Sequence, residues 1–368
     1  MSLVRVQAAE QSNLVNPTCP RPTRQLYAVI PCEILTVMKP NTKLISLKDN
    51  PRQIIKLLEE LVLTPRVSAL KWSAITKQTP NIKIGYPGQH LASLITGMCG
   101  ERTGARGNDL IDGSEVKSCS RIDQLDVCKK CGASVARSEE TCSACDSTDI
   151  IRKDDSKWLF TIRSESDLRV LLQDVNRIVL LMGDYPRFGE AHFSTLRFQA
   201  FEIWTRSTRN ARFAELMKNY YRKIYLAHKK NNVAKTPAPK NFWPFSYQFY
   251  LCNPIPVFEC IVTSADANPK IHIENYVEPH IDRSKIESVH MPVELLKDPE
   301  LGLILKKARP QEIQKCLVPG ARLKGMTVDR LRTSLKYIDE QLRSYLPLRD
   351  TDRISIATKA YARRVNES

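Results

Sequence analysis

The spacing of apolar residues predicts helices in the first quarter of the chain. A stripe of helical periodicity covers residues 51–63, where Asn50 is expected to cap the helix and Pro65 to end it. Further helices are expected over residues 67–76 and 88–97, and the second of these leads into a glycine-rich loop. The stripe of the first helix consists of Ile54, Leu57, Leu58 and Leu61.

The middle of the chain mixes strand-like and helix-like patterns. Residues 166–182 are predicted to form one long, largely buried helix, capped by a serine, between strands at 157–163 and 197–204. A proline-rich connector at 231–244 is the best candidate for a domain boundary. The remaining helices are expected over 212–230, 310–317 and 327–346, and the remaining strands over 247–252, 257–263 and 270–277.

Two of these helical regions also have features that occur in proteins binding nucleic acid. The helix at 212–230 interleaves lysines and arginines with tyrosines, which suits contact with a phosphate backbone or a surface helix whose tyrosines face the core. The helices at 310–317 and 327–346 have the order of a helix-turn-helix motif. Their turn is long for that motif, so ordinary packed helices are the alternative.

The bulk composition is that of a soluble globular protein with a polyanionic partner. The 368 residues contain 56 Lys and Arg against 40 Asp and Glu, a net charge of +16. Such an excess points to nucleic acid, although a basic surface kept for solubility is the alternative. No apolar run is long enough to span a membrane and no signal peptide is visible, so a cytoplasmic protein is expected. Eleven cysteines, four of them clustered, suit reduced thiols with one metal site.

The clustered cysteines form two CxxC pairs separated by ten residues. This spacing predicts a closed, tetrahedral zinc site with a structural role, and a redox or iron–sulfur site fits less well. Zinc would fold a loop that is too small to have a core of its own. Lys129, Lys130 and Arg137 give the loop a basic face, so it is a candidate contact for DNA. The predicted zinc ligands are Cys128, Cys131, Cys142 and Cys145.

Acidic residues and a lysine precede this cluster around an Asp-Gly turn signal. If the turn spans residues 112–114, Asp109 lies opposite Lys117 in a hairpin, and Asp109, Glu115 and Lys117 share one face. A two-residue turn would separate the two acids. Cys119 would continue the same face as a small buried residue.

Two carboxylates beside a lysine suit metal-assisted cleavage of a phosphodiester. The carboxylates can hold a hard cation such as Mg²⁺, which polarises a phosphate oxygen and lowers the pKa of a bound water. The lysine can orient that water and offset charge on the phosphate. Arg106 and Arg121 are candidate phosphate contacts on either side. Gln89 and His90, on the preceding helix, are near enough in sequence to approach the metal.

The run from Asp109 to Glu115-Val116-Lys117 resembles the signature of the PD-(D/E)xK nucleases. With the cysteine cluster behind it, the chain most resembles the type II restriction endonucleases of that superfamily, over about residues 85–165. The resemblance implies that Asp109 and Glu115 bind Mg²⁺ with the Val116 carbonyl. It also implies that Lys117 is catalytic and that the products carry 5′-phosphates.

The sequence departs from the family signature at two places. Asn108 stands where the family often has proline. Only five residues separate Asp109 from Glu115, which is short for the family. Asp112 or Glu101 therefore remain as alternatives for the first acid.

The resemblance implies a site-specific, Mg²⁺-dependent endonuclease that hydrolyses both strands of duplex DNA in a prokaryotic cell. Cutting two strands takes two active sites, so a homodimer on a two-fold symmetric site is expected. One alternative is a structure-specific repair or recombination nuclease of the same superfamily. The other is a non-catalytic zinc-ribbon protein that binds DNA.

The expected fold is mixed α/β, with a mixed central sheet flanked by helices, a small zinc ribbon and a mixed C-terminal region. Three regions are expected along the chain. Residues 1–80 would form an N-terminal helical region, and residues 81–190 the nuclease core, with the ribbon at 126–147. Residues 191–368 would supply DNA contacts and the dimer surface.

Overall fold

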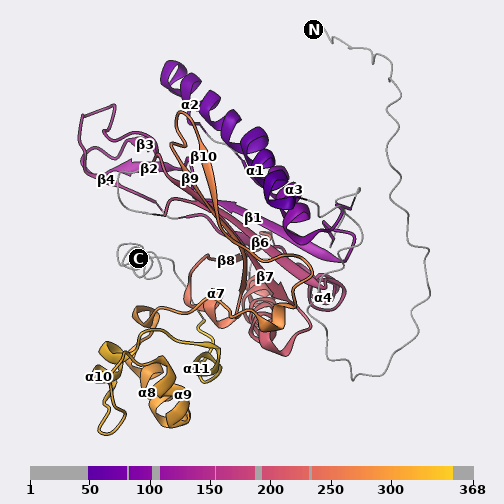
Figure 1. Ribbon diagram of the computed structural model, residues 1–368, viewed down its shortest axis with the longest axis vertical. Coiled ribbons are helices and arrows are strands. Elements are labelled where there is room, and N and C mark those ends of the chain that lie inside the picture. Colours follow the sequence, from indigo (N-terminus) through magenta and orange to yellow (C-terminus); the bar gives the residue numbers. More distant parts are fainter. Residues whose placement is uncertain are drawn as a thin grey trace, which may run out of the picture. The chain divides into compact units, whose positions relative to one another are not determined.

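The structure is a computed structural model (Figure 1). It describes residues 49–80, 83–101, 108–153, 155–186, 193–231 and 234–350. Arg106, a candidate phosphate contact, lies outside the described residues. Within the described ranges, every helix falls short of the length and hydropathy that a membrane span requires.

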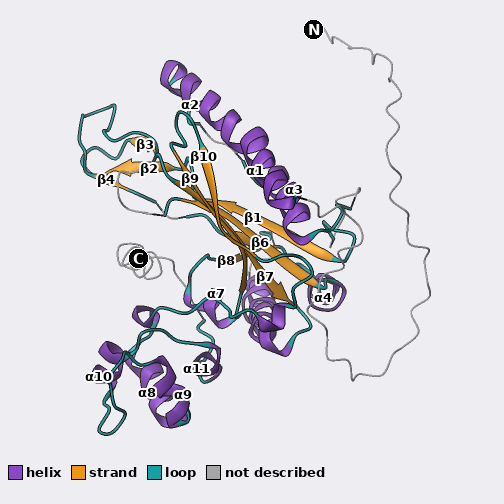
Figure 2. Ribbon diagram, in the orientation of Figure 1, coloured by secondary structure: helices purple, strands orange, loops and turns teal. Residues whose placement is uncertain are grey.

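A five-stranded mixed sheet lies at the centre of the fold (Figures 1 and 2). Its strand order is β1-β6-β7-β9-β10, with β1 and β6 parallel and the other neighbours antiparallel. Helices flank the sheet, so the expected mixed α/β fold is confirmed. The strands are β1 (Ser114–Ser120), β6 (Arg177–Asp184), β7 (Leu196–Trp204), β9 (Ile255–Thr263) and β10 (Lys270–Tyr276).

The prediction of one long helix over residues 166–182 is wrong, because the central strand β6 occupies its second half. Ser164 does cap a short helix, since its side chain accepts a hydrogen bond from the backbone N–H of Asp167. Every residue of β6 is buried. A strand buried on both faces has no alternation, so its sequence resembles that of a buried helix. The helical part is α4 (Glu165–Arg169) followed by the π turn η2 (Val170–Asp174).

A continuous helical rod runs along one face of the sheet, and Pro65 does not end it. Proline cannot donate a hydrogen bond and crowds the preceding turn. The wider π turn that comes directly before Pro65 gives that turn more room. Asp49, not Asn50, is the N-cap, and the Asn50 side chain donates to the Leu94 carbonyl on the next helix. The rod consists of α1 (Asn50–Leu58), η1 (Glu59–Leu63) and α2 (Thr64–Thr76), and a separate helix, α3 (Gly85–Thr96), packs against α1.

The opposite face of the sheet is covered by an aromatic core. The tyrosines of the basic helix are buried in this core, and the exposed Arg222 and Lys223 face solvent. Residues 247–252, expected as a strand, instead form helix α7, because Ser246 caps it by accepting from the N–H of Phe249. The elements are α5 (Ala211–Asn219), η4 (Tyr220–Tyr225), α6 (Leu226–Asn231) and α7 (Tyr247–Leu251).

The proline-rich connector contributes to the fold. It contains β8 (Lys240–Phe242), which pairs antiparallel with β5 (Trp158–Phe160). The sheet itself joins strands from both sides of residue 190. The boundary expected at residue 190 thus separates strands of one sheet, and the division into three regions stays a prediction.

A helical lobe follows the sheet. The helix expected over 327–346 is divided in two, because Leu335 is extended and bridges to Leu317. Short 3₁₀ turns at Thr208–Asn210, Arg283–Lys285 and Val293–Leu295 lie before it in the chain. The lobe consists of α8 (Asp298–Lys307), α9 (Pro310–Cys316), α10 (Val328–Ser334) and α11 (Glu340–Ser344).

Candidate active site and four-cysteine cluster

Strand β1 lies at the edge of the sheet and carries two of the predicted site residues. Glu115 and Lys117 are two positions apart, so they share a face, as the sequence predicted. The Lys117 ammonium donates to the Glu115 carboxylate. Both side chains are partly exposed, at 29% for Lys117 and 15% for Glu115. The pair is therefore accessible to a ligand.

Asp109 lies at the outer edge of the same strand. One of its carboxylate oxygens accepts the backbone N–H of Val116 at 2.8 Å, and the other accepts the Gln89 side-chain amide at 2.8 Å. The N–H and carbonyl of one residue in a strand point to the same side. The Val116 carbonyl therefore faces the edge where Asp109 lies. The structure brings Asp109, Glu115, Val116 and Lys117 together.

The predicted hairpin around Asp112-Gly113 does not form. Leu110 forms an isolated antiparallel β-bridge with Gly100 and no strand pairing with β1. The N–H of Gly113 donates to the Leu110 carbonyl, which closes a four-residue turn. Both Asp109 and Leu110 donate their N–H groups to the Ser114 carbonyl. Asp109 consequently lies beside the start of β1 and does not pair with Lys117.

The two alternative first acids have other surroundings. Asp112 accepts from Arg177 at 2.7 Å and from the N–H of Ser114 at 3.1 Å. Arg177 is completely buried, so Asp112 neutralises a structural guanidinium. Glu101 is exposed, and its backbone N–H donates to the Asp109 carbonyl. These contacts favour Asp109 as the first acid.

The electrostatics of the site favour a bound cation. Burial raises the pKa of Glu115 and outweighs the neighbouring Lys117, which lowers it. The charge of Asp109 raises this pKa further, which shows that the two carboxylates interact. A bound cation would stabilise the ionised form of Glu115, and a partly buried carboxyl with a raised pKa often marks a functional site.

Gln89, one of the two helix residues expected to be able to approach the metal, contacts the predicted ligand Asp109. A Cβ on the preceding Gly88 would lie 2.2 Å from the Ser118 hydroxyl, so glycine allows α3 to lie close against β1. That close approach brings Gln89 within reach of Asp109. His90, the other neighbour considered, is exposed.

The four cysteines of the predicted zinc site come together. All four sulfur atoms lie within 4.8 Å of one another, and Cys128–Cys145 and Cys131–Cys142 are 3.6 Å apart. Four thiolates about 2.3 Å from a tetrahedral zinc are about 3.8 Å apart, so the arrangement fits. The cluster is held by a small sheet of β3 (Ser134–Ala136), β2 (Leu125–Cys128) and β4 (Ile150–Ile151).

The two CxxC pairs have the same backbone turn. In each, the N–H four residues after the first cysteine returns to its carbonyl, from Gly132 to Cys128 at 2.9 Å and from Asp146 to Cys142 at 2.8 Å. Gly132 and Asp146 both have positive φ angles, of 75° and 53°. Hydrogen bonds from the Cys131 backbone lower the pKa of the Cys128 thiol to about 6, which favours the thiolate that metals bind.

Two of the expected DNA contacts near the cluster are corrected by the structure. Arg121 is only 1% exposed and donates to the Pro244 carbonyl, so it supports the core. Arg137 is also buried, where it makes two hydrogen bonds to Asp126. Its guanidinium holds the base of the cysteine loop and does not form a basic face.

The two lysines of the first CxxC pair remain at the surface. Lys129 is exposed and lies 3.3 Å from Asp149, and Lys130 is exposed as well. An exposed pair of this kind costs little to break, so both ammonium groups are available to an anion.

Comparison with known proteins gives the family. The chain matches the model of the MamI restriction endonuclease family over residues 71–294, more than half of its length. It is 37% identical over 78 residues to the type II restriction enzyme MamI of Microbacterium ammoniaphilum. That alignment covers 20% of this chain and 25% of the relative's length. No solved structure matches. The chain belongs to the MamI restriction endonuclease family.

Proposed function

We propose that this protein is a type II restriction endonuclease that cuts both strands of duplex DNA by metal-dependent hydrolysis. One observation carries the proposal: Asp109, Glu115 and Lys117 meet at the open edge of β1, in a chain of a restriction endonuclease family. The matched relative is named a type II restriction enzyme. The excess of basic residues suits a DNA substrate.

Each site residue has a separate role. Asp109 and Glu115 would hold Mg²⁺, with the Val116 carbonyl as a third oxygen ligand. The ion supplies polarisation of the phosphate and a lowered pKa for a bound water. Lys117 would orient the attacking water and offset the charge that develops on the phosphate. The water oxygen bonds to phosphorus and gives up a proton to solvent while the P–O3′ bond breaks, so O3′ leaves, takes up a proton from solvent, and the phosphate stays on the 5′ end of the product. Gln89 positions Asp109 through its hydrogen bond.

The four cysteines hold zinc in a structural site. Four sulfur ligands leave no open position, so the ion does not take part in cleavage. The loop leaves β1 directly after the site residues, and zinc stabilises a segment whose own apolar core is very small. The exposed Lys129 and Lys130 remain candidate DNA contacts.

Cleavage of plasmid DNA tests the proposed function. With Mg²⁺, the protein is expected to give discrete fragments with 5′-phosphate ends, and Ca²⁺ in its place should support binding without cleavage. A homodimer should convert supercoiled plasmid to linear DNA with little nicked intermediate. Cutting only at branched or damaged DNA would favour a structure-specific repair nuclease. Binding without cutting would favour the non-catalytic alternative.

Substituting Gln89 tests its positioning role. Gln89→Ala is expected to lower the cleavage rate about tenfold to 100-fold, because supporting contacts of metal ligands typically contribute that much. Raising the Mg²⁺ concentration should restore part of the rate, since metal binding is what weakens. His90→Ala, at the exposed neighbouring position, is the control. A Gln89→Ala enzyme with unchanged Mg²⁺ dependence would contradict the role.

Metal analysis tests the four-cysteine site. The purified protein is expected to contain about one zinc per chain, and Cys128→Ser should lose it, because one closed site needs all four thiolates. Cys260→Ser, at a buried cysteine of β9, should keep the metal. Wild-type protein without bound zinc, or Cys128→Ser protein that retains it, would refute this site.

A further inference from the structure

The C-terminal lobe carries a set of exposed, unneutralised cations. Its helices begin after residue 294, where the family match ends. Four other cations of the lobe form ion pairs, and they are Arg309, Lys315, Arg332 and Arg349. Among the described residues 298–350, six exposed basic side chains have no acidic group within ion-pair distance. They are Lys306, Lys307, Arg322, Lys324, Arg330 and Lys336.

Most of these cations belong to one end of the lobe. Helices α8 and α10 pack antiparallel, because Arg332 binds Asp298 at the start of α8 while Val328, at the start of α10, faces Gly302. The last turn of α8 is therefore at the same end as the segment leading into α10. We refer to this end, with its cations Lys306, Lys307, Arg322, Lys324 and Arg330, as the basic end.

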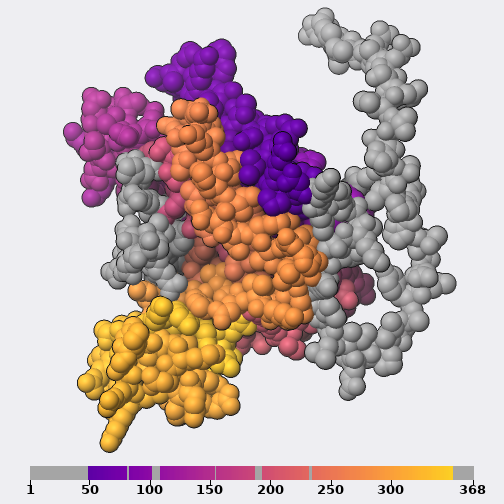
Figure 3. Space-filling view, in the orientation of Figure 1, coloured from indigo at the N-terminus to yellow at the C-terminus, as the bar shows by residue number. Residues whose placement is uncertain are grey.

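The loop between α9 and α10 is ordered by two successive tight turns. Residues 318–321 and 323–326 are each closed by a hydrogen bond from the fourth N–H to the first carbonyl. Gly320 and Gly325 occupy the third positions with φ angles of 84° and 73°, as a type II turn requires. The loop projects from the lobe in Figures 1 and 3. Its exposed cations are Arg322 and Lys324.

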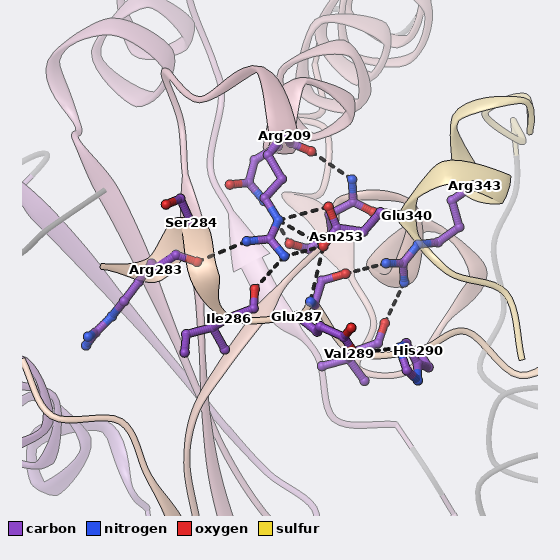
Figure 4. Close-up of polar contacts among 12 residues, drawn as sticks. Arg209, Asn253, Arg283, Ser284, Ile286, Glu287, Val289, His290, Glu340 and Arg343 are labelled. Carbon is purple, nitrogen blue, oxygen red and sulfur yellow. Dashed lines mark hydrogen bonds and ion pairs between the residues drawn. The ribbon is translucent and has the colours of Figure 1, made fainter. Parts of the chain in front are cut away.

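Partly buried polar contacts join the lobe to segments beside the sheet. Arg209, which follows β7, binds Glu340 of α11 and also donates to the carbonyls of Arg283 and Ile286 (Figure 4). Arg343 donates to the Val289 carbonyl. These contacts join α11 to the segment that follows β7.

We propose that the basic end binds the phosphate backbone of the duplex that is cut at β1, away from the scissile bond. The inference rests on the proposed function for the identity of the duplex. Preorganised lysines and arginines on a loop and a helix are a common means of holding a phosphate backbone. A membrane surface fits less well, because Val318 is the only large apolar side chain exposed on the described lobe.

DNA binding at several salt concentrations tests this inference. Two variants, Lys306→Gln/Lys307→Gln and Arg322→Gln/Lys324→Gln, are compared with the wild type by fluorescence anisotropy on a duplex with Ca²⁺ in place of Mg²⁺. Each variant should bind more weakly. The slope of log K against log salt should fall by about 0.9 for each phosphate that the variant no longer neutralises. Lys71→Gln/Lys77→Gln removes the same charge from exposed positions of α2 and its C-cap, where no DNA contact is proposed, and is the matched control.

The outcomes separate this inference from the proposed function. Weaker binding and a smaller salt slope in the lobe variants, but not in the control, support the basic end. An equal loss in all three variants overturns it, because net charge alone would explain the result. Unchanged binding by the lobe variants, or no duplex binding by the wild type, also overturns it. A wild type that binds through the lobe but never cuts would remove only the cleavage proposal.

Discussion

Replacing Lys117 with alanine is expected to lower the rate of DNA cleavage by about 10³-fold or more, since a positioned catalytic side chain typically contributes 10² to 10⁴. The Lys117 ammonium lies against Glu115 at the edge of β1, where a metal-bound water would be oriented. Single-turnover cleavage with saturating enzyme measures the loss, and binding in Ca²⁺ should change little. Lys71→Ala, at an exposed lysine of α2, is the control.

Glu115→Gln should abolish cleavage as well. The variant is expected to be no less stable than the wild type, so unfolding would not explain the loss of activity. The folded protein raises the pKa of Glu115, chiefly by burial. A carboxyl with a raised pKa contributes stability below its unfolded pKa and loses it as the pH rises through the folded value. At neutral pH and without Mg²⁺, the ionised Glu115 therefore lowers the free energy of unfolding. Glu115→Gln should melt no lower than the wild type there, and a clear drop in Tm would contradict this.

Replacing Arg177 with methionine is expected to lower the free energy of unfolding by about 3–5 kcal/mol, as removing one partner of a buried ion pair does. Arg177 has no exposed surface and binds Glu202, Asp112 and the Ser114 hydroxyl. Burial opposes ionisation of Glu202, but the charges of Arg177 and Arg283 lower its pKa overall. Without Arg177, one guanidinium remains to neutralise a completely buried carboxylate.

Urea unfolding measures this loss, with Arg222→Met as an exposed control that should change stability by less than about 0.5 kcal/mol. Arg177→Met should also slow cleavage in protein that is still folded. Arg177 holds Asp112, and Asp112 lies in the turn that places Asp109 beside β1. A loss below about 1 kcal/mol would mean that Glu202 is adequately paired by Arg283 alone, contrary to the expectation for a buried charge.

The parts of the site that sequence predicted are those set by local spacing. Two CxxC pairs define a metal site because each turn brings its own cysteines together, and the sheet β2–β4 only joins the two turns. Glu115 and Lys117 were predictable for the same reason, since a strand places alternate residues on one face. Neither inference needed a distant part of the chain.

The parts that sequence missed depend on contacts between distant elements. Strand β6 resembles a helix in sequence because it is covered on both sides, and that covering is a property of the whole fold. The role of Asp112 is set by Arg177, which is 65 residues away in the chain. Gln89 reaches Asp109 only because α3 packs closely on β1.

The contact between Gly88 and Ser118 limits how this family can vary in sequence. Gly88 bears no side chain, yet alanine there would meet the Ser118 hydroxyl at 2.2 Å and the Leu181 side chain at 3.3 Å. The Ser118 hydroxyl would have to rotate away, and the Ser118 Cβ and the Leu181 side chain, at 3.2 and 3.3 Å, would have to shift slightly. Relatives with the same close contact between α3 and β1 are therefore expected to favour glycine at position 88. An alignment of relatives would then show an invariant glycine whose conservation reflects the spacing of two backbones.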